Sequence, residues 1–288
     1  MDRVKIDVRP ITDEDAATVS RFLHEHLNAT VSPAAWRAVL APPWQADPPN
    51  HGFTLVTGGT IVGVYLAVYS VRDVNGEERR FCNLAAFCVL AEYRAHSFRL
   101  MRAILAQPGF EFTDFSPSGN VVALNERLGF SALDTATRLA PNLPRLPRRG
   151  LTVTENPSAL TAVLTGRDAR VYRDHLDAPA ARHIVAIEGE DYGYLVVRKD
   201  RRKRLPMFSS PLYVGGNRDL LRRAWPQIGS HLLFRHAELA TLAERRLLGF
   251  APAFGIDVGK HRSKMLRSGS VPADAVDYLY SELTLLDW

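Results

Sequence analysis

The chain has 288 residues, 46% hydrophobic and 23% charged, the balance of a globular protein large enough for two ordinary domains. It has no apolar run of the ~18 residues that a membrane-spanning helix needs, and its N-terminus lacks the apolar core of a signal peptide, so we expect a cytoplasmic protein without a membrane span. The net charge is +5, and the densest basic run covers residues 198–204. Since no aromatic nucleic-acid motif accompanies this run, we interpret it as a solvated hairpin tip and do not expect nucleic-acid binding.

Periodicity and turn residues predict the elements of the first half. A short strand at 4–8 is followed by a helix that begins with a capping box of Thr12 and Asp15. Further along the chain we expect a second helix ending at 42–43, a hairpin at 53–69, a polar segment at 72–80, a strand at 81–90, a helix at 99–105, a strand at 110–115, a helix at 121–128 and a last strand after Phe130.

The cysteines and the possible metal ligands indicate neither disulfides nor a metal site. Cys82 and Cys88 are the only cysteines, too few for a disulfide framework. Six residues apart in an apolar, strand-like run, they fall on the same face of a regular strand, so we expect two buried thiols. No cluster with metal-ligand spacing is visible along the sequence, so we expect no metal.

The region 141–150 has three prolines in seven residues and can neither continue a helix nor lie in a central strand. We interpret it as a linker between a first domain, 1–140, and a second domain, 151–288. The second half repeats the plan of the first, because a hairpin with Gly193 matches the hairpin with Gly63, and the Leu-Gly-Phe around Gly129 recurs around Gly249. These landmarks favour two copies of one domain, the second shortened, over a short solenoid repeat.

The segment 87–100 is the most informative about function. An apolar strand runs into a turn of small and basic residues, and a helix begins at once. The start of a helix presents unpaired backbone N–H groups and the positive end of the helix dipole, which attract phosphate. Arg94 and Arg99 would add charge-assisted contacts to a pyrophosphate. An ordinary strand–helix connection with solvated arginines explains the same residues, and these residues alone leave both interpretations open.

This segment resembles the signature of the GNAT superfamily of acyl-CoA N-acyltransferases, in which a strand ending in Val leads into a Tyr-Arg-Gly-x-Gly-x-Gly loop and a helix. Val89, Tyr93 and Arg94 match the signature, and the stretch from Ser118 to Phe130 matches the family's closing pattern of a polar residue, a helix and Leu-Gly-Phe. The resemblance covers about 1–140 and, more faintly, 151–288. It implies an α/β (α+β) fold of two GNAT-like domains, the second degenerate, each with a mixed, mostly antiparallel twisted sheet flanked by helices.

The resemblance also implies that acetyl-CoA or another acyl-CoA binds along this turn. A backbone N–H near 87–89 would hold the thioester oxygen, and strands splayed at a bulge would admit the pantetheine arm between 81–90 and 110–115. The residues expected to bind the acyl-CoA are Phe87, Cys88, Val89, Arg94, Ala95, His96, Ser97, Phe98 and Arg99.

The sequence departs from the family at four positions. Ala95, Ser97 and Arg99 replace the three loop glycines, which weakens the match, because glycine lets a backbone approach a phosphate. Asn125 replaces the tyrosine that often protonates the departing thiolate.

The acceptor amine must lose a proton, so the site needs a base. His26 is one candidate, since histidine is the side chain most often used as a base near neutral pH, although its place on an apolar helix stripe equally fits a core histidine. Asn83 could orient an acceptor or a water. Ser116 is the third catalytic candidate, although it could simply cap the turn that follows it.

We therefore expect an N-acyltransferase that moves an acetyl or longer acyl group from acyl-CoA to an amine of a small molecule or sugar, by direct attack in a ternary complex. An acidic acyl carrier protein is an alternative donor that would suit the basic excess. A FemABX-type aminoacyltransferase, which also joins two GNAT-like halves, and a catalytically inactive GNAT-like binding module stay open as other functions. In the second half, Gly215-Gly216-Asn217 and Asp219 replace the arginine-bearing turn, so we expect no CoA there.

Overall fold

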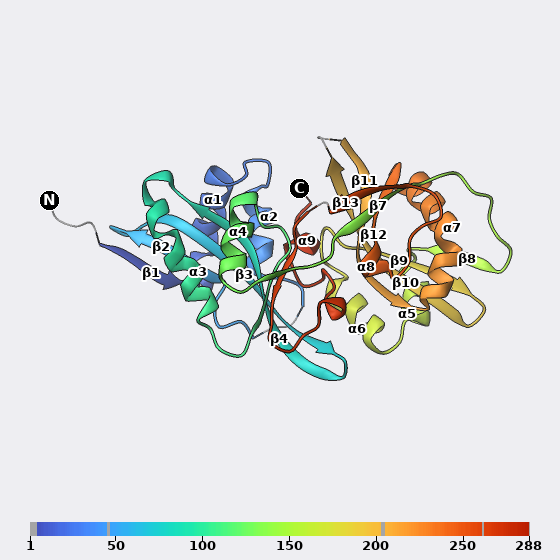
Figure 1. Cartoon of the computed structure of the whole chain (residues 1–288), viewed down its shortest axis with the longest axis horizontal. Coiled ribbons are helices and arrows are strands. Elements are labelled where there is room, and N and C mark those ends of the chain that lie inside the picture. Colours follow the sequence, from blue (N-terminus) through green and yellow to red (C-terminus); the bar gives the residue numbers. More distant parts are fainter. Residues whose placement is uncertain (1–4, 45–46, 203–204, 261, 288) are drawn as a thin grey trace. The chain divides into compact units, whose positions relative to one another are not determined.

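The computed structural model describes residues 5–44, 47–202, 205–260 and 262–287. The chain forms two compact units, and its C-terminal part contributes to both of them (Figure 1). Unit 1 comprises Met1–Ala132, Lys264–Ala275 and Tyr280–Leu286, and unit 2 comprises Leu133–Ser263, Val276–Leu279 and Asp287–Trp288.

Unit 1 is built on a mixed sheet of seven strands in the order β1-β2-β3-β4-β5-β14-β6, in which β4 and β5 run parallel and the other neighbours antiparallel. The strands are β1 (Ile6–Pro10), β2 (Gly52–Thr57), β3 (Thr60–Val74), β4 (Glu77–Val89), β5 (Glu111–Asp114), β6 (Ser131–Ala132) and β14 (Met265–Arg267). The helical segments are η1 (Asp13–Asp15), α1 (Ala16–His26), α2 (Pro33–Leu40), η2 (Ala91–His96), α3 (Ser97–Leu105), α4 (Gly119–Arg127), η3 (Ala273–Ala275) and α9 (Glu282–Leu285).

Helices cover both faces of β3, a strand near the middle of the sheet of unit 1. Successive side chains of a strand point to opposite faces, and every residue of β3 from Ile61 to Ser70 is buried. The apolar side of α3 forms one hydrophobic core with alternate residues of β3, while α1 and α2 contact each other and the same strand. Thr12 and Asp15 form the predicted capping box. The core under α3 includes Tyr65, Ala67, Tyr69, Leu100, Met101 and Ile104.

Unit 2 contains a second mixed seven-stranded sheet, in the order β8-β9-β10-β11-β12-β7-β13. Again one central pair, β11 and β12, runs parallel. Its elements are β7 (Ala136–Pro141), β8 (Leu151–Thr154), α5 (Pro157–Val163), α6 (Gly166–His175), β9 (Arg182–Glu188), β10 (Asp191–Arg202), β11 (Leu205–Gly216), α7 (Arg218–His236), β12 (Ala240–Glu244), α8 (Arg245–Leu248) and β13 (Ile256–Lys260).

Corresponding irregularities support the duplication. A register shift between Leu66 and Ala67 bulges β4 against β3, and a shift between Val196 and Val197 does the same to β11 against β10. The helices ahead of the two Leu-Gly-Phe motifs are followed by glycines with positive φ, +86° at Gly129 and +75° at Gly249. The two halves therefore share this bulge and this glycine turn as well as the order of their strands.

The strand next to β5 or β12 comes from the other half of the chain in both units. β14, near the C-terminus, lies between β5 and β6, and β7, from the first half, lies between β12 and β13. The first unit therefore ends at Ala132 rather than at 140, and it regains residues after Ser263. Local sequence patterns contain no information about such an exchange.

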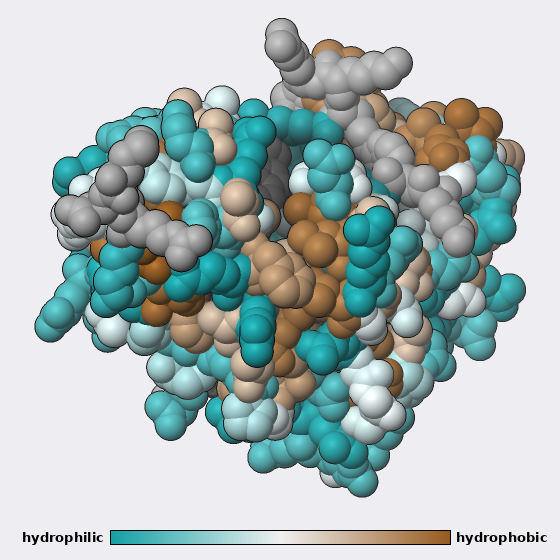
Figure 2. Space-filling view, turned by 60° about the vertical axis from the view of Figure 1, so that its left-hand side comes forward, coloured by the Kyte–Doolittle hydropathy of each residue, from teal (hydrophilic) through white to brown (hydrophobic). Residues whose placement is uncertain are grey.

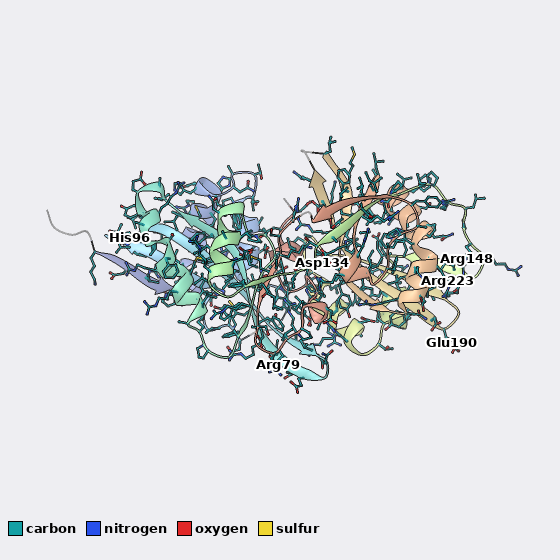
Figure 3. All side chains as sticks on the ribbon, viewed as in Figure 1. Arg79, His96, Asp134, Arg148, Glu190 and Arg223 are labelled. Carbon is teal, nitrogen blue, oxygen red and sulfur yellow. The ribbon has the colours of Figure 1, made fainter. Side chains whose placement is uncertain are left out.

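The proline-rich region 141–150 belongs to unit 2 rather than serving as a spacer. The Arg145 N–H donates to Ser230 Oγ of α7 at 3.1 Å, and Arg148 pairs with Glu188 of β9. Glu188 also pairs with Arg223 of α7 at 3.0 Å, and Figure 3 labels both arginines. This region can run along α7 outside any sheet, because its prolines have no backbone N–H that would need a hydrogen-bond acceptor.

The structure also differs from two local predictions, for residues 72–80 and for the sides that the two cysteines face. The polar segment 72–80 is a hairpin between β3 and β4 rather than a connection, with positive φ at Asn75 and Gly76, as tight hairpin turns require. Both cysteines are buried and free, as expected. They face opposite sides, because the bulge in β4 between them adds one residue to the alternation.

On the face drawn in Figure 2, hydrophilic side chains surround groups of hydrophobic ones. The basic run extends β10 as far as Arg202, and Arg198 within it is buried rather than solvated. Residues 203–204 of that run, like Val4 of the first predicted strand, lie outside the described residues. No helix in the described part of the chain is long and apolar enough to cross a membrane.

Candidate active site

The two parallel strands of unit 1 separate beyond Asn83. β4 pairs with β5 at three positions that end with Asn83 opposite Thr113. Across the described residues no further pairing joins these strands, although β4 continues to Val89. The bulge of β4 against β3 begins at the same place. One edge of β4 is therefore open from Leu84 onward, the splay expected between these two strands.

Two backbone amides point to this open edge. The Leu90 N–H donates to Val62 O of β3 at 3.0 Å. In an antiparallel ladder, alternate residues donate to the same neighbour, so the N–H of Cys88 also faces β3. The N–H groups of Phe87 and Val89 then face the opposite edge. Amides in this position can hold a carbonyl oxygen that gains negative charge.

The turn after β4 is helical rather than a glycine loop. Residues Ala91–His96 form the 3-10 segment η2, and α3 starts directly at Ser97. Ser97 has φ −57° and ψ −36°, ordinary helical angles that any residue adopts, so the turn forms without the family's glycines. Among the described residues no side chain caps the first turn of α3, whose N-cap is His96 (labelled in Figure 3). The Ser97 N–H donates to the Arg94 carbonyl within η2, so a ligand would meet the amides of this turn without competition from a side chain, but not that of Ser97.

The two arginines of the turn differ in their contacts. Arg99 Nη1 donates to the Ile6 carbonyl of β1 at 2.8 Å, so it ties α3 to the sheet as well as lying beside the turn. Both arginines are exposed, as are Ala95 and Phe98, but only Arg99 has this bond to the sheet. Arg94 is therefore the arginine better placed to meet a phosphate.

A buried polar cluster lies where β4 and β5 separate. Glu282 of α9 accepts hydrogen bonds from Asn83 Nδ2 at 2.5 Å and from Ser116 Oγ at 2.6 Å, one on each carboxylate oxygen. Thr113 Oγ1 donates to Asn83 Oδ1 at 3.0 Å. Glu282, Asn83 and Thr113 are fully buried. The structure thus joins two of the three predicted catalytic residues through a carboxylate that the sequence analysis did not identify.

A second carboxyl group, Asp114, lies beside this cluster. Burial, and then the negative charge of Glu282, raise the pKa of Asp114 to about 7. Asn125 Nδ2 donates to Asp114 Oδ2 at 2.9 Å, so the residue at the family's tyrosine position contacts a carboxyl group that gains and loses its proton near neutral pH. Asn125 Oδ1 and the Tyr65 hydroxyl are buried without a hydrogen-bond partner among the described residues, and such groups can be satisfied by a bound substrate.

His26 is separate from these groups. It lies exposed at the end of α1, with its ring 4.8 Å from that of Phe22 and its Nε2 3.9 Å from Glu25 Oε2. Within the described residues, no hydrogen bond connects it to Asn83, Ser116 or Glu282. It is therefore neither a core histidine nor a member of the cluster.

Glu282 could not be found from local spacing, because 199 residues separate it from Asn83. One signal was present in the sequence. Glu282 is the sole charge in an otherwise apolar and hydroxylic run from Tyr278 to Leu286. A carboxylate buried in such a run needs hydrogen-bond partners, which makes it a candidate for a site.

In unit 2, the chain's own side chains occupy the corresponding turn. The Asn217 side chain caps α7 by accepting two first-turn N–H groups at 3.0 Å. The Asp168 carboxylate accepts the Gly216 N–H at 2.9 Å and the Tyr213 hydroxyl at 2.6 Å. A Cβ on Gly215 would lie 2.0 Å from Asp168 Oδ1. Unit 2 thus provides side-chain acceptors for the amides of its turn, whereas no side chain among the described residues caps α3 in unit 1.

No protein-family model matches the sequence, and no curated protein matches it either. Solved structures do match. A GCN5-related N-acetyltransferase from Anabaena variabilis aligns over 91% of this chain and 72% of its own, at 11% identity and TM-score 0.58. A putative acetyltransferase from Pyrococcus horikoshii aligns over 98% of both chains, at 11% identity and TM-score 0.56.

A third match is the GCN5-related glucosamine N-acetyltransferase region of a fungal multi-domain β-N-acetylglucosaminidase. It aligns over 92% of this chain and 38% of its own, at 13% identity and TM-score 0.60. At these identities the likeness concerns the fold. The open β4–β5 edge, the two mostly antiparallel sheets and these alignments together show that the chain has the fold of the GCN5-related N-acetyltransferases, the GNAT superfamily, in two copies.

Proposed function

We propose that unit 1 binds an acyl-CoA along the β4–η2–α3 turn and transfers its acyl group to an amine. The observation that carries the proposal is the contrast between the two copies. The first-turn amides of α3 have no side-chain cap among the described residues, whereas Asn217 and Asp168 fill the matching turn of unit 2. An uncapped helix start with an exposed Arg94 suits a pyrophosphate.

The residues of the turn would divide the binding between them. Ala95 and His96 would present their backbone to the phosphates, Ser97 would offer its hydroxyl because its N–H donates to the Arg94 carbonyl, and Arg94 would add charge. The outward amides of Phe87 and Val89 would hold the thioester oxygen, since donors fixed in advance need no reorganisation as charge develops there. Cys88 would only support the strand, because its amide faces β3.

Two carboxyl groups would handle the protons. Glu282, held by Asn83 and Ser116, would accept the proton that the attacking amine loses. Asp114, whose pKa of about 7 keeps a proton available near neutral pH, would donate to the departing thiolate from beside Asn125. In this assignment Asn83 and Ser116 position the base, and His26 takes no part.

An amino sugar or another small amine is the acceptor class that we propose. A fungal relative in fold is described as a glucosamine N-acetyltransferase region, although it is only 13% identical. The three polar groups around Glu282 are suited to a polar acceptor rather than an apolar one.

Acetyl-CoA binding and turnover by the full-length chain test the proposal. Arg94→Ala should weaken acetyl-CoA binding about tenfold in calorimetry, whereas Arg102→Ala, an exposed arginine in the last turn of the same helix, should not. Glu282→Gln should leave acetyl-CoA affinity unchanged and lower kcat for glucosamine or another amine by about 100-fold or more. Equal acetyl-CoA affinity of the Arg94 and Arg102 variants would contradict the binding site.

A binding module without catalysis is the second candidate, and one observation favours it. Glu282 already fills its carboxylate with hydrogen bonds inside the fold, and Arg99 is engaged by Ile6. In that case acetyl-CoA binds with the same dependence on Arg94, but no amine on a broad panel is acylated. Turnover that depends on Glu282 excludes this candidate.

A further inference from the structure

Three possible metal ligands converge in unit 2, outside the groups discussed above. Glu155 lies between β8 and α5, and His231 and His236 lie in the last part of α7. Their ligand atoms all lie within 4.8 Å of one another. His231 Nε2 is 2.9 Å and His236 Nε2 is 2.6 Å from the same oxygen, Glu155 Oε1.

The sequence spacing predicted no metal site, and the local geometry explains why. Residues three or four apart share a helix face, but His231 and His236 are five apart. Both rings contact Glu155, which belongs to another element, the connection between β8 and α5. His236 is the last residue of α7, and the left-handed Ala237, with φ +54°, ends the helix there.

The chemistry of the three groups suits a divalent transition metal. Two imidazoles and one carboxylate are the ligand set of many zinc sites that keep one coordination position open. Zinc bonds of about 2.0–2.1 Å would place tetrahedral ligand atoms about 3.3 Å apart, so the two N–O separations of 2.9 and 2.6 Å would have to widen by only roughly half an ångström.

The cluster is accessible from solvent. Each of the three side chains keeps about a fifth of its surface exposed, between 19% and 23%. Glu155 and His231 also line an open cavity of about 820 Å³ in the same unit. A metal ion can therefore enter, and a water or a ligand in the cavity can reach a fourth coordination position.

We propose that Glu155, His231 and His236 form a Zn²⁺-binding site of unit 2, with its fourth coordination position directed to the adjoining cavity. The site is independent of the acyl-transfer groups of unit 1. Bound metal would hold the β8–α5 connection to the C-terminal end of α7 more firmly than the two hydrogen bonds do.

The experiment uses the full-length chain, stripped with a chelator, dialysed and titrated with zinc sulfate. We expect one equivalent of tightly bound zinc per chain by elemental mass spectrometry and a rise in Tm of about 5 °C. Glu155→Gln, His231→Gln and His236→Gln should each weaken zinc binding by at least about tenfold. Glu155→Gln keeps an oxygen acceptor for both histidines, so it removes the ionised ligand while leaving a hydrogen-bond anchor in place.

His51→Gln is the matched control. His51 Nε2 also contacts a single carboxylate oxygen, Asp13 Oδ1 at 2.7 Å, but without a second histidine. The His51 variant should bind zinc like the wild type. A wild-type chain that retains no zinc after dialysis, or ligand variants that bind it as tightly as the wild type, would overturn the proposal.

A visible absorption spectrum of the wild-type chain with Co²⁺ tests, without any variant, whether the three residues bind a metal ion. Co²⁺ in a four-coordinate site absorbs visible light far more strongly than the hydrated ion does. We expect the strong four-coordinate bands, and their loss when one equivalent of zinc is added. A spectrum like that of free Co²⁺ would mean that the three residues are only a hydrogen-bonded cluster.

Discussion

Asp114 and Glu282 bring two carboxyl groups into the same buried region, where both cannot be ionised without repulsion. The two carboxyl groups have different surroundings. Glu282 accepts hydrogen bonds from Asn83 and Ser116, while burial, and then the negative charge of Glu282, raise the pKa of Asp114 to about 7. Two acids with different environments can then take opposite roles in proton transfer.

This arrangement predicts a pH-dependent stability. The pKa of Asp114 is about 7 in the folded chain against 3.8 for a free side chain, so the folded state keeps a proton that the unfolded state releases. Its contribution is fully present below pH 3.8 and is lost as pH rises toward 7. Asp114→Asn should therefore increase the free energy of unfolding, relative to wild type, by roughly 2–3 kcal/mol more at pH 8 than at pH 5.

Urea unfolding at the two pH values measures this difference. Asp7→Asn, at an exposed carboxylate on β1, serves as the control, and its effect should not change with pH by more than a few tenths of a kcal/mol. An Asp114→Asn effect that is the same at both pH values would mean that Asp114 is ionised throughout this range.

At the scale of single elements, the strand–helix turn is the part of the fold in which the two copies differ chemically. Unit 1 leaves the amides of this turn uncapped among the described residues, and unit 2 occupies them with Asn217 and Asp168. Asp168 also receives hydrogen bonds from the Tyr192 and Tyr213 hydroxyls at 2.9 and 2.6 Å. A side chain of unit 2 therefore occupies the turn that corresponds to the phosphate site we propose for unit 1.

The close approach of Asp168 makes Gly215 sensitive to substitution. A Cβ there would lie 2.0 Å from Asp168 Oδ1 and would displace the carboxylate from its partners. We expect Gly215→Ala to destabilise the protein by about 2 kcal/mol or more, lowering Tm by several degrees in a circular dichroism melt. Gly269→Ala, where a Cβ meets nothing within 4 Å, should stay within about 0.5 kcal/mol of wild type. Equal melting of the two variants would show that Asp168 moves aside freely.

Most of the elements could be predicted from the sequence, because alternation, periodicity and capping are local. The structure has three of them where the patterns predicted them: the hairpin with Gly63, the capping box at Thr12 and helix α3. The prediction that residues 72–80 only connect two strands was wrong, because charged residues also occur along exposed hairpins. Unit boundaries could not be predicted, since β7 and β14 each join the sheet of the other half.

The candidate site was predicted only in part, because some of its residues come from distant parts of the chain. The strand–helix turn is a contiguous motif, and Asn83 and Ser116 lie within 33 residues of each other, so local reasoning found them. Glu282 reaches them from the far end of the chain, and Glu155 reaches the histidines of α7 from another element. Contacts of this kind depend on the tertiary fold, which no local pattern encodes.

Across the whole molecule, unit 1 depends on residues from the C-terminal part of the sequence. Met265 of β14 is fully buried in the hydrophobic core that includes Leu100 and Phe130. Met265→Ala should therefore cost about 2–5 kcal/mol through the lost packing and the cavity that it leaves. Hydrogen exchange should speed up in β5, the neighbour of β14, although this strand is about 150 residues away in sequence.

Leu146→Ala is the control, because Leu146 is 87% exposed and should contribute little. If Met265→Ala left exchange in β5 at the wild-type rate, β14 would not be an integral strand of the first sheet.

The exchange of strands sets the order in which this protein can be completed during translation. When Ala132 leaves the ribosome, β5 still lacks its neighbour, and roughly 130 further residues must follow, which takes about 7–26 s at usual synthesis rates. Throughout that interval the nascent first sheet presents an unpaired edge to chaperones and to other chains. Since Glu282 follows β14, a polypeptide whose synthesis stops early contains the Arg94 turn but no base, so incomplete products would be unable to carry out the proposed reaction.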